Sequence, residues 1–379
     1  MKDILKLFIV KMARFAFKIF WVFPTKYDTI LFESFEGQHY SDNPKYLYKF
    51  ITENFGKKYK YVWVLNTDEK IDGACKTVKF LSLRHVFYFT TAKYIVSNHK
   101  IESCFPKRKK QLFVNTWHAS GAYKSVTLTD AISTRYRVNT RDYQAKNIDF
   151  FVSGCQKFSE ELSKSWNADI AKFIPTGLPR NDILFRRDLK ELKKNIQNKL
   201  NLSDDCGYLL FAPTYRGDFR NHRKFDFGID ERKILLACEK RFGKPFKMLF
   251  RAHTWYSEDE RKNGNGIIDV SAYPDMQELL LCADVFVTDY SSCMWDFALL
   301  NRPGFLYVPD LDEYDSDVGF YTPISDWPFP YARTNEGLEE LVLNYSESAN
   351  IKKIKQHFDL LGSFEKGNAC EQIVKYMGL

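Results

Sequence analysis

Short apolar runs alternate with helical patterns along most of the chain, beginning near Asp28. Each run is long enough for one buried strand, and the segments between the runs are long enough for a helix. The runs in the first half are Thr29–Phe35, Tyr61–Leu65, Tyr94–Ser97, Leu112–Thr116, Phe150–Ser153 and Lys172–Pro175. The runs in the second half are Tyr208–Ala212, Lys247–Phe250, Ile267–Val270, Val285–Thr288 and Phe305–Val308. Strands separated by helices in this way predict an α/β protein with parallel, doubly wound sheets.

A charged, helix-forming stretch from Phe185 to Asp205 separates the two sets of strands and marks a domain boundary. The 379 residues of the chain supply enough apolar material for two cores. We therefore predict Rossmann-like domains over residues 24–190 and 191–379, facing each other across a cleft. Many two-domain α/β enzymes share this architecture, so the pattern alone does not choose among them.

Residues 1–23 form a separate amphipathic segment with an apolar face and a basic face. At about 100° per residue, one face collects Ile4, Leu5, Phe8, Ile9, Met12, Phe15, Ala16 and Ile19. The opposite face collects Lys6, Lys11, Arg14 and Lys18. These cations interrupt the segment too often for it to span a bilayer. The pattern favours a helix lying in the interface of an anionic membrane, and a helix docked on its own domain is the alternative.

The chain carries a formal charge of +8, with 56 lysine and arginine residues against 48 aspartate and glutamate residues. This excess favours anionic partners such as phosphorylated substrates or a membrane surface. No recognised nucleic-acid-binding module is present, so we expect no nucleic acid among the partners. The eight cysteines are scattered, without a C-x-x-C pair or a Cys/His cluster at zinc spacing. They predict reduced thiols in a cytosolic protein without a metal site.

Several familiar catalytic signatures are missing from the sequence. It contains no P-loop, no G-x-G-x-x-G dinucleotide fingerprint, no G-x-S-x-G elbow and no H-E-x-x-H zinc motif. These absences count against ATP hydrolysis, hydride transfer, ester hydrolysis and zinc proteolysis.

Polar and basic residues follow six of the predicted strands, at the edge where open parallel sheets collect ligands. In the first half these candidates are Asn43, His118, Lys124, Arg180, Asn181 and Asp182. In the second half they are Arg216, His253, Asp289, Ser291 and Ser292. Because the strand ends are divided between two domains, we expect them to converge on one interdomain cleft.

His118 follows the run Leu112–Thr116 and precedes a turn of small residues, Ala119–Gly121. An imidazole presented there can act as a general base, because its ordinary pKa of about 6.5 lies near neutral pH. A histidine satisfied inside the fold is the alternative. His253 occupies the same kind of position in the second half, where it can donate to a phosphoryl oxygen or stabilise a leaving group.

The segment after Thr288 has the features of an anion site. Ser291 and Ser292 follow a sharp turn at Asp289 and open a helix, whose unpaired N–H groups attract a phosphate. An ordinary serine cap is the alternative.

Five further residues have the chemistry to bind a phosphorylated ligand. Arg180 can grip a phosphate bidentately, and Lys124 can offset phosphate charge. Asn181 and Asp182 bind a hydroxyl or cap the next helix. Arg216 is either a phosphate ligand or a solvated loop charge.

Six segments of the chain occur in the order found in a known family. They are SDNPKYLY (Ser41–Tyr48), WHASGAYKS (Trp117–Ser125), PTGLPRNDIL (Pro175–Leu184), FAPTYR (Phe211–Arg216), RAH (Arg251–His253) and VTDYSSCMWDFALLNRP (Val287–Pro303). Together they resemble the CDP-glycerol glycerophosphotransferases, the teichoic-acid primase- and polymerase-like transferases of Gram-positive bacteria. The resemblance runs from about Asp28 to the C-terminus. It implies a GT-B-like fold with an N-terminal acceptor domain and a C-terminal CDP-alcohol donor domain.

The resemblance also implies roles for individual residues. His118 would be the catalytic base and His253 its counterpart near the phosphate. The CDP-alcohol site would be lined by Arg180, Asn181, Asp182, Ser291 and Ser292.

The implied reaction transfers glycerol phosphate, or a related polyol phosphate, from CDP-glycerol or another CDP-alcohol. The acceptor would be a hydroxyl of an undecaprenyl-diphosphate-linked saccharide or growing polymer. CMP would leave, and no cofactor is expected. The basic N-terminal segment would hold the protein peripherally at the cytoplasmic face of the cell membrane.

Two local departures from the family pattern leave the donor alcohol open between glycerol, ribitol and another polyol. Many members have His-Gly-Thr-Pro where this chain has His118–Gly121, a form typical of the primase-like branch. Many also have Arg-Gly-Phe where this chain has Val318–Phe320. A GT-B glycosyltransferase that uses a nucleotide sugar is an alternative enzyme, and a membrane-associated binding protein without turnover is an alternative outside catalysis.

Overall fold

The computed structural model describes residues 2–100, 102–125, 134–214, 216–218, 221–222, 227–252 and 266–379. Contacts divide them into two compact units. The first unit holds the described residues up to Ala119, residues 134–182 and Ser363–Leu379. The second unit holds Ser120–Ser125 and the described residues of Ile183–Gly362. The α/β class predicted from the sequence is confirmed, because each unit is built around a parallel sheet.

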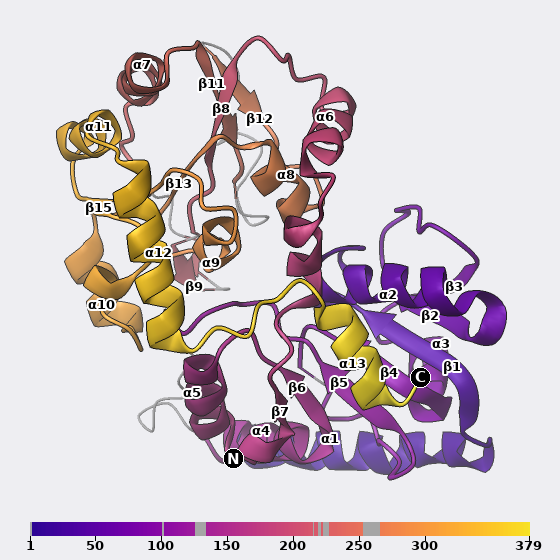
Figure 1. Cartoon of the computed structure of the whole chain (residues 1–379). Coiled ribbons are helices and arrows are strands. Elements are labelled where there is room, and N and C mark those ends of the chain that lie inside the picture. The colour runs from indigo at the N-terminus through magenta and orange to yellow at the C-terminus, as the bar shows by residue number, and fades with distance from the viewer. Residues whose placement is uncertain are drawn as a thin grey trace. The chain divides into compact units, whose positions relative to one another are not determined.

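The first unit has a seven-stranded sheet in the order β3-β2-β1-β4-β5-β6-β7, and all of its neighbouring strands are parallel (Figure 1). The strands are β1 (Lys26–Glu33), β2 (Lys60–Val64), β3 (Cys75–Val78), β4 (Ala92–Ser97), β5 (Leu112–Asn115), β6 (Phe150–Val152) and β7 (Phe173–Ile174). The edge strand β3 was not predicted, because only Val78 of its four residues is buried and no apolar run marks it.

The first unit also contains the following helices. They are α1 (Lys2–Phe17), η1 (Lys18–Val22), η2 (Phe35–Gly37), α2 (Asp42–Phe55), η3 (Gly56–Lys58), α3 (Leu83–Thr91), α4 (Arg135–Asn147), α5 (Gln156–Trp166), η5 (Ile170–Lys172), η6 (Pro179–Phe185) and α13 (Ala369–Met377). One core cluster joins Phe32, Trp63 and Val114 of the strands to Ile373 of α13.

The position of α13 differs from the predicted contiguous ranges 24–190 and 191–379. Figure 1 shows this yellow helix against the strands of the first unit. The reason is packing, because Cys370, Ile373, Val374 and Met377 complete the core of the first unit. Conversely, the short segment Ser120–Ser125 lies within the predicted range 24–190 but belongs to the second unit.

The second unit has a six-stranded sheet in the order β12-β11-β8-β13-β14-β15, again parallel throughout. Its strands are β8 (Gly207–Phe211), β11 (Phe246–Phe250), β12 (Ile267–Asp269), β13 (Val285–Thr288), β14 (Gly304–Tyr307) and β15 (Tyr331–Ala332), with a separate hairpin of β9 (Gly217–Asp218) and β10 (Asn221–His222). Its helices are α6 (Leu189–Lys199), α7 (Glu231–Phe242), α8 (Met276–Cys282), α9 (Cys293–Ala298), α10 (Leu311–Val318), η8 (Ile324–Asp326), α11 (Asn335–Leu343) and α12 (Glu347–Leu361). Every predicted strand run contains a strand of the structure.

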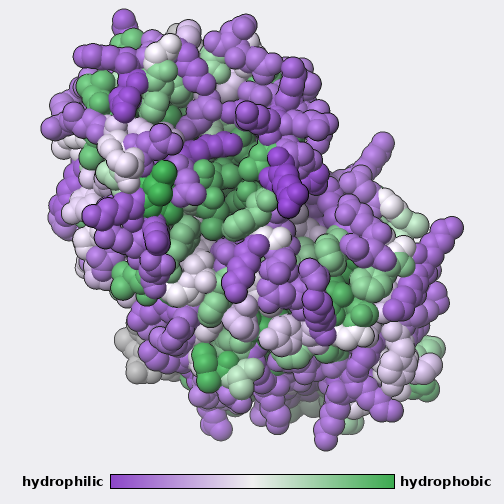
Figure 2. Space-filling model, viewed as in Figure 1, coloured by the Kyte–Doolittle hydropathy of each residue, from purple (hydrophilic) through white to green (hydrophobic). Residues whose placement is uncertain are grey.

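Hydrophilic side chains cover most of the face seen in Figure 2. The eight cysteines are all free thiols, as the sequence predicted. Among the described residues, no helix combines the length and the hydrophobicity that crossing a bilayer requires.

Candidate functional site

His118 lies just beyond the carboxyl end of β5, and the backbone fixes its tautomer. Its Nδ1 atom lies 3.1 Å from the carbonyl oxygen of Asn98. A carbonyl oxygen only accepts hydrogen bonds, so Nδ1 carries the hydrogen and donates it. The lone pair of the neutral ring is therefore on Nε2, the atom that can accept a proton from a substrate.

The surroundings of His118 keep its imidazole neutral. Burial lowers the pKa of His118 to about 4, although the hydrogen bond to Asn98 and the charge of Asp42 oppose the shift. The ring stacks on Trp117, with ring centroids 4.7 Å apart and an interplanar angle of 25°. At neutral pH the ring is therefore in the unprotonated form that a general base needs.

The backbone before His118 adopts an unusual conformation that presents the imidazole. Trp117 has a φ of 49°, in the left-handed region that bulky residues rarely occupy. Its N–H donates to Oδ1 of Asn115 at 2.8 Å, and its carbonyl oxygen accepts from Nδ2 of Asn43 at 3.0 Å. Such strain persists only where surrounding contacts enforce it, and it concentrates at functional sites.

Arg180 and Asp42 form an ion pair beside the backbone of His118. Nη1 of Arg180 donates to Oδ1 of Asp42 at 2.7 Å and to the carbonyl oxygen of His118 at 2.7 Å. The other carboxylate oxygen of Asp42 accepts from Nδ2 of Asn98 at 2.6 Å. Both charged side chains are only 7% exposed. Arg180 therefore holds the backbone of His118, and the contacts of this arginine favour a positioning role over a bidentate grip on phosphate.

Asn43 has a similar role at the start of α2. Its side chain is fully buried, and its Nδ2 donates to the carbonyl oxygens of Thr116 and Trp117 at 3.3 and 3.0 Å. Its Oδ1 accepts from the backbone N–H of Arg180 at 3.1 Å. The predicted substrate-binding role of Asn43 stays a prediction, because its amide already joins α2, β5 and η6.

Asn181 and Asp182 anchor the C-terminal segment to the first unit. Nδ2 of Asn181 donates to Oε1 of Glu365 at 2.9 Å. The two carboxylate oxygens of Asp182 accept from the N–H groups of Ala369 and Cys370, each at 2.8 Å. Asp182 thus caps α13 rather than the helix that follows it in sequence, and its proposed contact with the donor stays a prediction.

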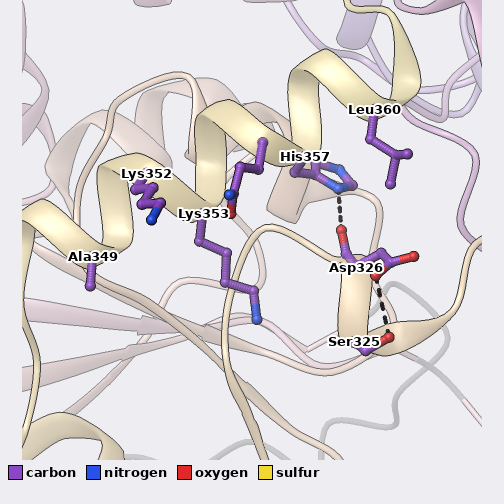
Figure 3. Close-up of a pocket in the computed structure, with 8 residues that line it drawn as sticks. Ser325, Asp326, Ala349, Lys352, Lys353, His357 and Leu360 are labelled. Carbon is purple, nitrogen blue, oxygen red and sulfur yellow. Dashed lines mark hydrogen bonds between the residues drawn. The ribbon is translucent and has the colours of Figure 1, made fainter.

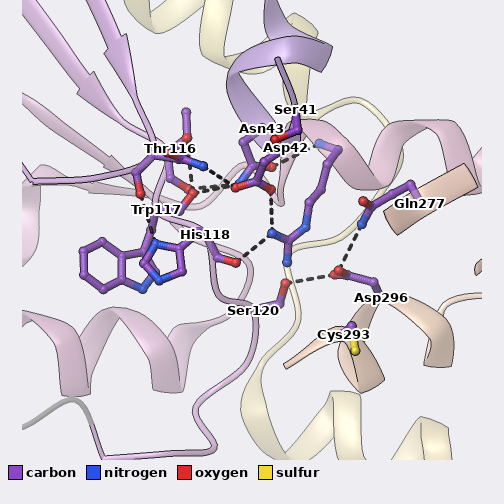
Figure 4. A network of polar contacts seen from close by, with 12 residues as sticks. Ser41, Asp42, Asn43, Thr116, Trp117, His118, Ser120, Gln277, Cys293 and Asp296 are labelled. Carbon is purple, nitrogen blue, oxygen red and sulfur yellow. Dashed lines mark hydrogen bonds and ion pairs between the residues drawn. The ribbon is translucent and has the colours of Figure 1, made fainter. Parts of the chain in front are cut away.

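The segment directly after His118 is held within the second unit. Oγ of Ser120 donates to Oδ1 of Asp296 at 2.9 Å, and Nε2 of Gln277 donates to the other oxygen of that carboxylate at 3.0 Å (Figure 4). The N–H of Ser125 donates to the carbonyl oxygen of Gly319 at 2.9 Å. This segment carries Lys124, another predicted site residue.

Asp289 and Arg216 form a buried ion pair at the carboxyl ends of β8 and β13. Asp289 is fully buried and accepts from the N–H and the hydroxyl of Thr214, the latter at 2.6 Å. Nη1 of Arg216 lies 2.8 Å from Oδ2 of Asp289, and its Nε lies 2.6 Å from Oδ2 of Asp310. The guanidinium also lies 4.9 Å from the ring centroid of Tyr290. Arg216 is therefore a buried, doubly paired cation and not a solvated loop charge.

Two partly buried cations of the second unit, Lys124 and Arg251, interact with the start of α9. Oγ of Ser291 lies 2.9 Å from Sγ of Cys293 and accepts from the N–H of Cys293 at 3.5 Å, whereas the side chain of Ser292 makes no cap hydrogen bond. Burial lowers the pKa of Lys124, with Asp289 opposing, and burial lowers the pKa of Arg251, with Asp275 opposing. Both cations interact electrostatically with Cys293. A bound anion would relieve the cost of burying these charges.

His253, the second predicted catalytic histidine, lies outside the described residues. The sequence analysis missed Asn98, Asp42 and Arg251. Asn98 and Arg251 directly follow β4 and β11, so the same rule of polar residues at strand ends had the signal to find them. Asp42 had no such signal, because its importance depends on a partner far away in the sequence.

A separate pocket of about 360 Å³ lies in the second unit beside η8 and α12 (Figure 3). It is lined by Ser325, Asp326, Ala349, Lys352, Lys353, Gln356, His357 and Leu360. Nδ1 of His357 donates to the carbonyl oxygen of Asp326 at 2.6 Å, and its Nε2 accepts from the hydroxyl of Tyr123 at 2.8 Å. None of the predicted site residues lines this pocket.

Comparison with known proteins identifies the family. The profile described as CDP-Glycerol:Poly(glycerophosphate) glycerophosphotransferase matches residues 15–378. The chain belongs to this family of transferases. It is 29% identical to the teichoic acid poly(glycerol phosphate) polymerase of Bacillus spizizenii, covering 97% of this chain and 96% of that protein. It is 31% identical to the polymerase of the same name from Staphylococcus epidermidis over 91% of this chain, but it spans only 50% of that longer protein.

A solved structure agrees with this assignment. The wall teichoic acid polymerase TagF superposes with a TM-score of 0.83 and 28% identity, covering 100% of this chain and 97% of that chain. A UDP-N-acetylglucosamine 2-epimerase from Listeria monocytogenes, at 11% identity and a TM-score of 0.52, shares the fold alone. The GT-B-like class implied by the resemblance is confirmed, as is the enzyme family.

Proposed function

We propose that this protein transfers glycerol phosphate from CDP-glycerol to a hydroxyl of a lipid-linked saccharide or polymer in teichoic acid synthesis. The observation that carries the proposal is the state of His118 in a chain of this family. Its ring is neutral and its Nδ1–H donates to the carbonyl oxygen of Asn98, which leaves the lone pair on Nε2.

In this reaction His118 acts as the general base. Nε2 takes the proton of the acceptor hydroxyl while the hydroxyl oxygen forms a bond to the β-phosphorus of CDP-glycerol. The bond from that phosphorus to the bridging oxygen breaks, and CMP leaves with the electron pair. No covalent intermediate with the protein is needed, because positioning and electrostatics carry most of a phosphoryl transfer.

The donor diphosphate binds at the start of α9 in this proposal. Lys124 and Arg251 supply partly buried positive charge, while Ser291 and Ser292 supply hydroxyls and backbone N–H groups. A variant of TagF has been solved after a soak with CDPG, which supports a CDP-alcohol donor for this relative. His253, from the segment after β11, is proposed to stabilise the leaving phosphate.

The N-terminal helix is proposed to hold the protein on an anionic membrane at its cytoplasmic face. One face of α1 is fixed to the first unit, since the ring of Phe17 packs on Phe105 and Nε of Arg14 donates to the carbonyl oxygen of Ser103 at 2.8 Å. The predicted apolar face remains exposed, with Phe8 at 59% and Phe15 at 70%. A docked helix with an exposed apolar face is suited to burial in the lipid interface. Arg108 also ties the segment after η1 to the first unit, because its Nη2 donates to the carbonyl oxygen of Phe23 at 2.7 Å.

The central test offers the protein CDP-glycerol and CDP-ribitol in competition, with a synthetic undecaprenyl-diphosphate-linked disaccharide as acceptor. We expect release of CMP, and a gain of one or more glycerol phosphate units in the mass spectrum of the lipid product. A product carrying ribitol phosphate would reassign the donor. Turnover of a nucleotide sugar without use of either CDP-alcohol would overturn the proposal.

Vesicle flotation tests the membrane contact separately. Wild type should float with vesicles that contain phosphatidylglycerol, and Phe8→Asp/Phe15→Asp should remain in solution because the two carboxylates oppose burial of the apolar face. Leu236→Asp is the control, because Leu236 is a 53% exposed apolar residue of the second unit. Equal flotation of all three proteins would exclude α1 as the anchor.

A further inference from the structure

A second histidine, His99, lies beside His118 and pairs with Glu36. The proposed mechanism does not use this Glu36–His99 pair. The rings of His99 and His118 are stacked, with centroids 6.3 Å apart and an interplanar angle of 25°. Nδ1 of His99 lies 3.1 Å from Oε1 of Glu36. The side chains of His99 and Glu36 are 29% and 39% exposed, so a ligand can reach both.

The backbone that carries Glu36 is strained. Phe35, Glu36 and Gly37 have φ values of 45°, 56° and 78°, all in the left-handed region. Non-glycine residues rarely adopt this conformation, so the surrounding structure must enforce it. The N–H of Phe35 donates to Oδ1 of Asn98 at 2.9 Å. The same asparagine that accepts from His118 therefore also fixes the turn that carries Glu36.

The side chains of Glu36 and His99 are suited to binding neutral hydroxyl groups. The imidazole of His99, 3.1 Å away, lowers the pKa of Glu36, so the carboxylate is charged at neutral pH although burial opposes this. A carboxylate accepts hydrogen bonds from hydroxyls and repels phosphates. An imidazole beside it adds a second hydrogen-bonding group. The pair is no metal site, since the described residues contain no cluster of His, Cys, Asp and Glu side chains arranged to hold an ion.

We propose that Glu36 and His99 form the subsite that binds an acceptor hydroxyl next to the one that attacks. This inference rests on the proposed function, because it places the reacting hydroxyl at Nε2 of His118. The ligand is the polyol or sugar end of the acceptor, which carries neighbouring hydroxyls. The negative charge of Glu36 keeps the phosphate groups of the acceptor out of this subsite. Glu36 and His99 therefore determine which end of the acceptor is presented to the base.

The test compares two synthetic lipid-linked acceptors that differ by a single hydroxyl, next to the reacting one. Wild type should prefer the complete acceptor by roughly tenfold or more in kcat/KM, because a site built to bind a hydroxyl rejects the analogue that lacks it. Glu36→Gln should lower this preference, and Glu36→Ala should abolish it. The KM for CDP-glycerol should stay unchanged in both variants.

Two further variants separate binding from structure. Glu36→Gly relieves the left-handed strain and should raise the melting temperature by about 2 °C while it still abolishes the acceptor preference. Glu69→Gln is the matched control, because His39 and Glu69 form a similar pair, 3.3 Å apart and 36% and 31% exposed, in the same unit. This control should keep the full preference.

The outcomes distinguish the two proposals. Failure of wild type to release CMP from CDP-glycerol with either acceptor would overturn the proposed function and this inference with it. Normal turnover combined with an unchanged preference in Glu36→Ala would overturn the inference alone. Loss of preference in Glu69→Gln as well would also overturn it, because the effect would then not be specific to the pair beside His118.

Discussion

The His118 edge of the first unit and the α9 edge of the second unit occupy the same topological position but have opposite electrostatics. Both lie at the carboxyl ends of parallel strands, where open α/β sheets bind ligands. The first edge holds a neutral imidazole with a carboxylate nearby. The second holds the partly buried cations Lys124 and Arg251. In our proposal the first edge therefore binds a neutral hydroxyl and the second edge binds an anion.

The largest expected effect on activity comes from a substitution at the His118 edge. His118→Ala should lower the rate of CMP release from CDP-glycerol by about 10²- to 10⁴-fold, because the acceptor hydroxyl loses its base. His39→Ala, which changes a half-exposed histidine of the same unit, is the control and should keep normal turnover. Steady-state assays with a lipid-linked acceptor make the measurement. Full activity of His118→Ala would show that the His118 edge does not supply the general base.

Next in size is the loss of the buried ion pair that supports the neutral edge. Arg180→Ala leaves the carboxylate of Asp42 buried and unpaired, which should cost about 3–5 kcal/mol in the free energy of unfolding. Arg333→Ala removes an exposed pair with Asp312, whose side chain is 84% exposed, and should cost about 0–1 kcal/mol. Urea denaturation of the two variants measures the difference. Equal costs would show that the Asp42–Arg180 pair is not the support of His118.

A smaller effect, on donor binding alone, is expected from substitutions at the α9 edge. Lys124→Ala or Arg251→Ala should raise the KM for CDP-glycerol by roughly 10- to 100-fold, since a hydrogen bond to a charged group is worth about 1.5–3 kcal/mol. The KM for the acceptor should change little, in contrast to variants of Glu36. Lys352→Ala, in the pocket beside α12, serves as the control cation. A rise in the acceptor KM instead would reverse the assignment of donor and acceptor to the two edges.

The smallest effect is in the pH dependence. Because burial lowers the pKa of His118 to about 4, its neutral form persists as the pH falls and is lost only near that value. The kcat/KM of wild type should therefore stay flat from pH 8 to about 5, whereas a base with the ordinary pKa of about 6.5 would already have lost most of its activity at pH 5. An inflection near pH 6.5 would show that His118 is not held neutral.

The strand pattern could be predicted because buried strands of a parallel sheet are continuous apolar runs. The runs around Phe32, Val114 and Val287 all became central or buried strands. The edge strand β3 could not be predicted, since its residues are mostly exposed and its sequence lacks the signal. The return of α13 to the first unit was also not predictable, because an amphipathic helix does not specify which of two cores it completes.

His118 lies directly after β5, as the sequence predicted, but its tautomer depends on Asn98, which is 20 residues away. The contacts of Arg180 with Asp42 and of Asp182 with α13 could not be read from the sequence, and the ligand-binding roles of these residues stay predictions.

The sequence by itself determined the α/β class, the family and the strand ends at which the candidate residues lie, because apolar periodicity and short motifs are local properties of the chain. Only the tertiary structure decided which polar side chains bind one another and which remain accessible. It paired Asp42 with Arg180 across 138 residues and brought Glu36 to within 3.1 Å of His99. The physical reason is that the charge, tautomer and accessibility of a side chain depend on its neighbours in space, and burial in a fold brings those neighbours together from distant parts of the sequence.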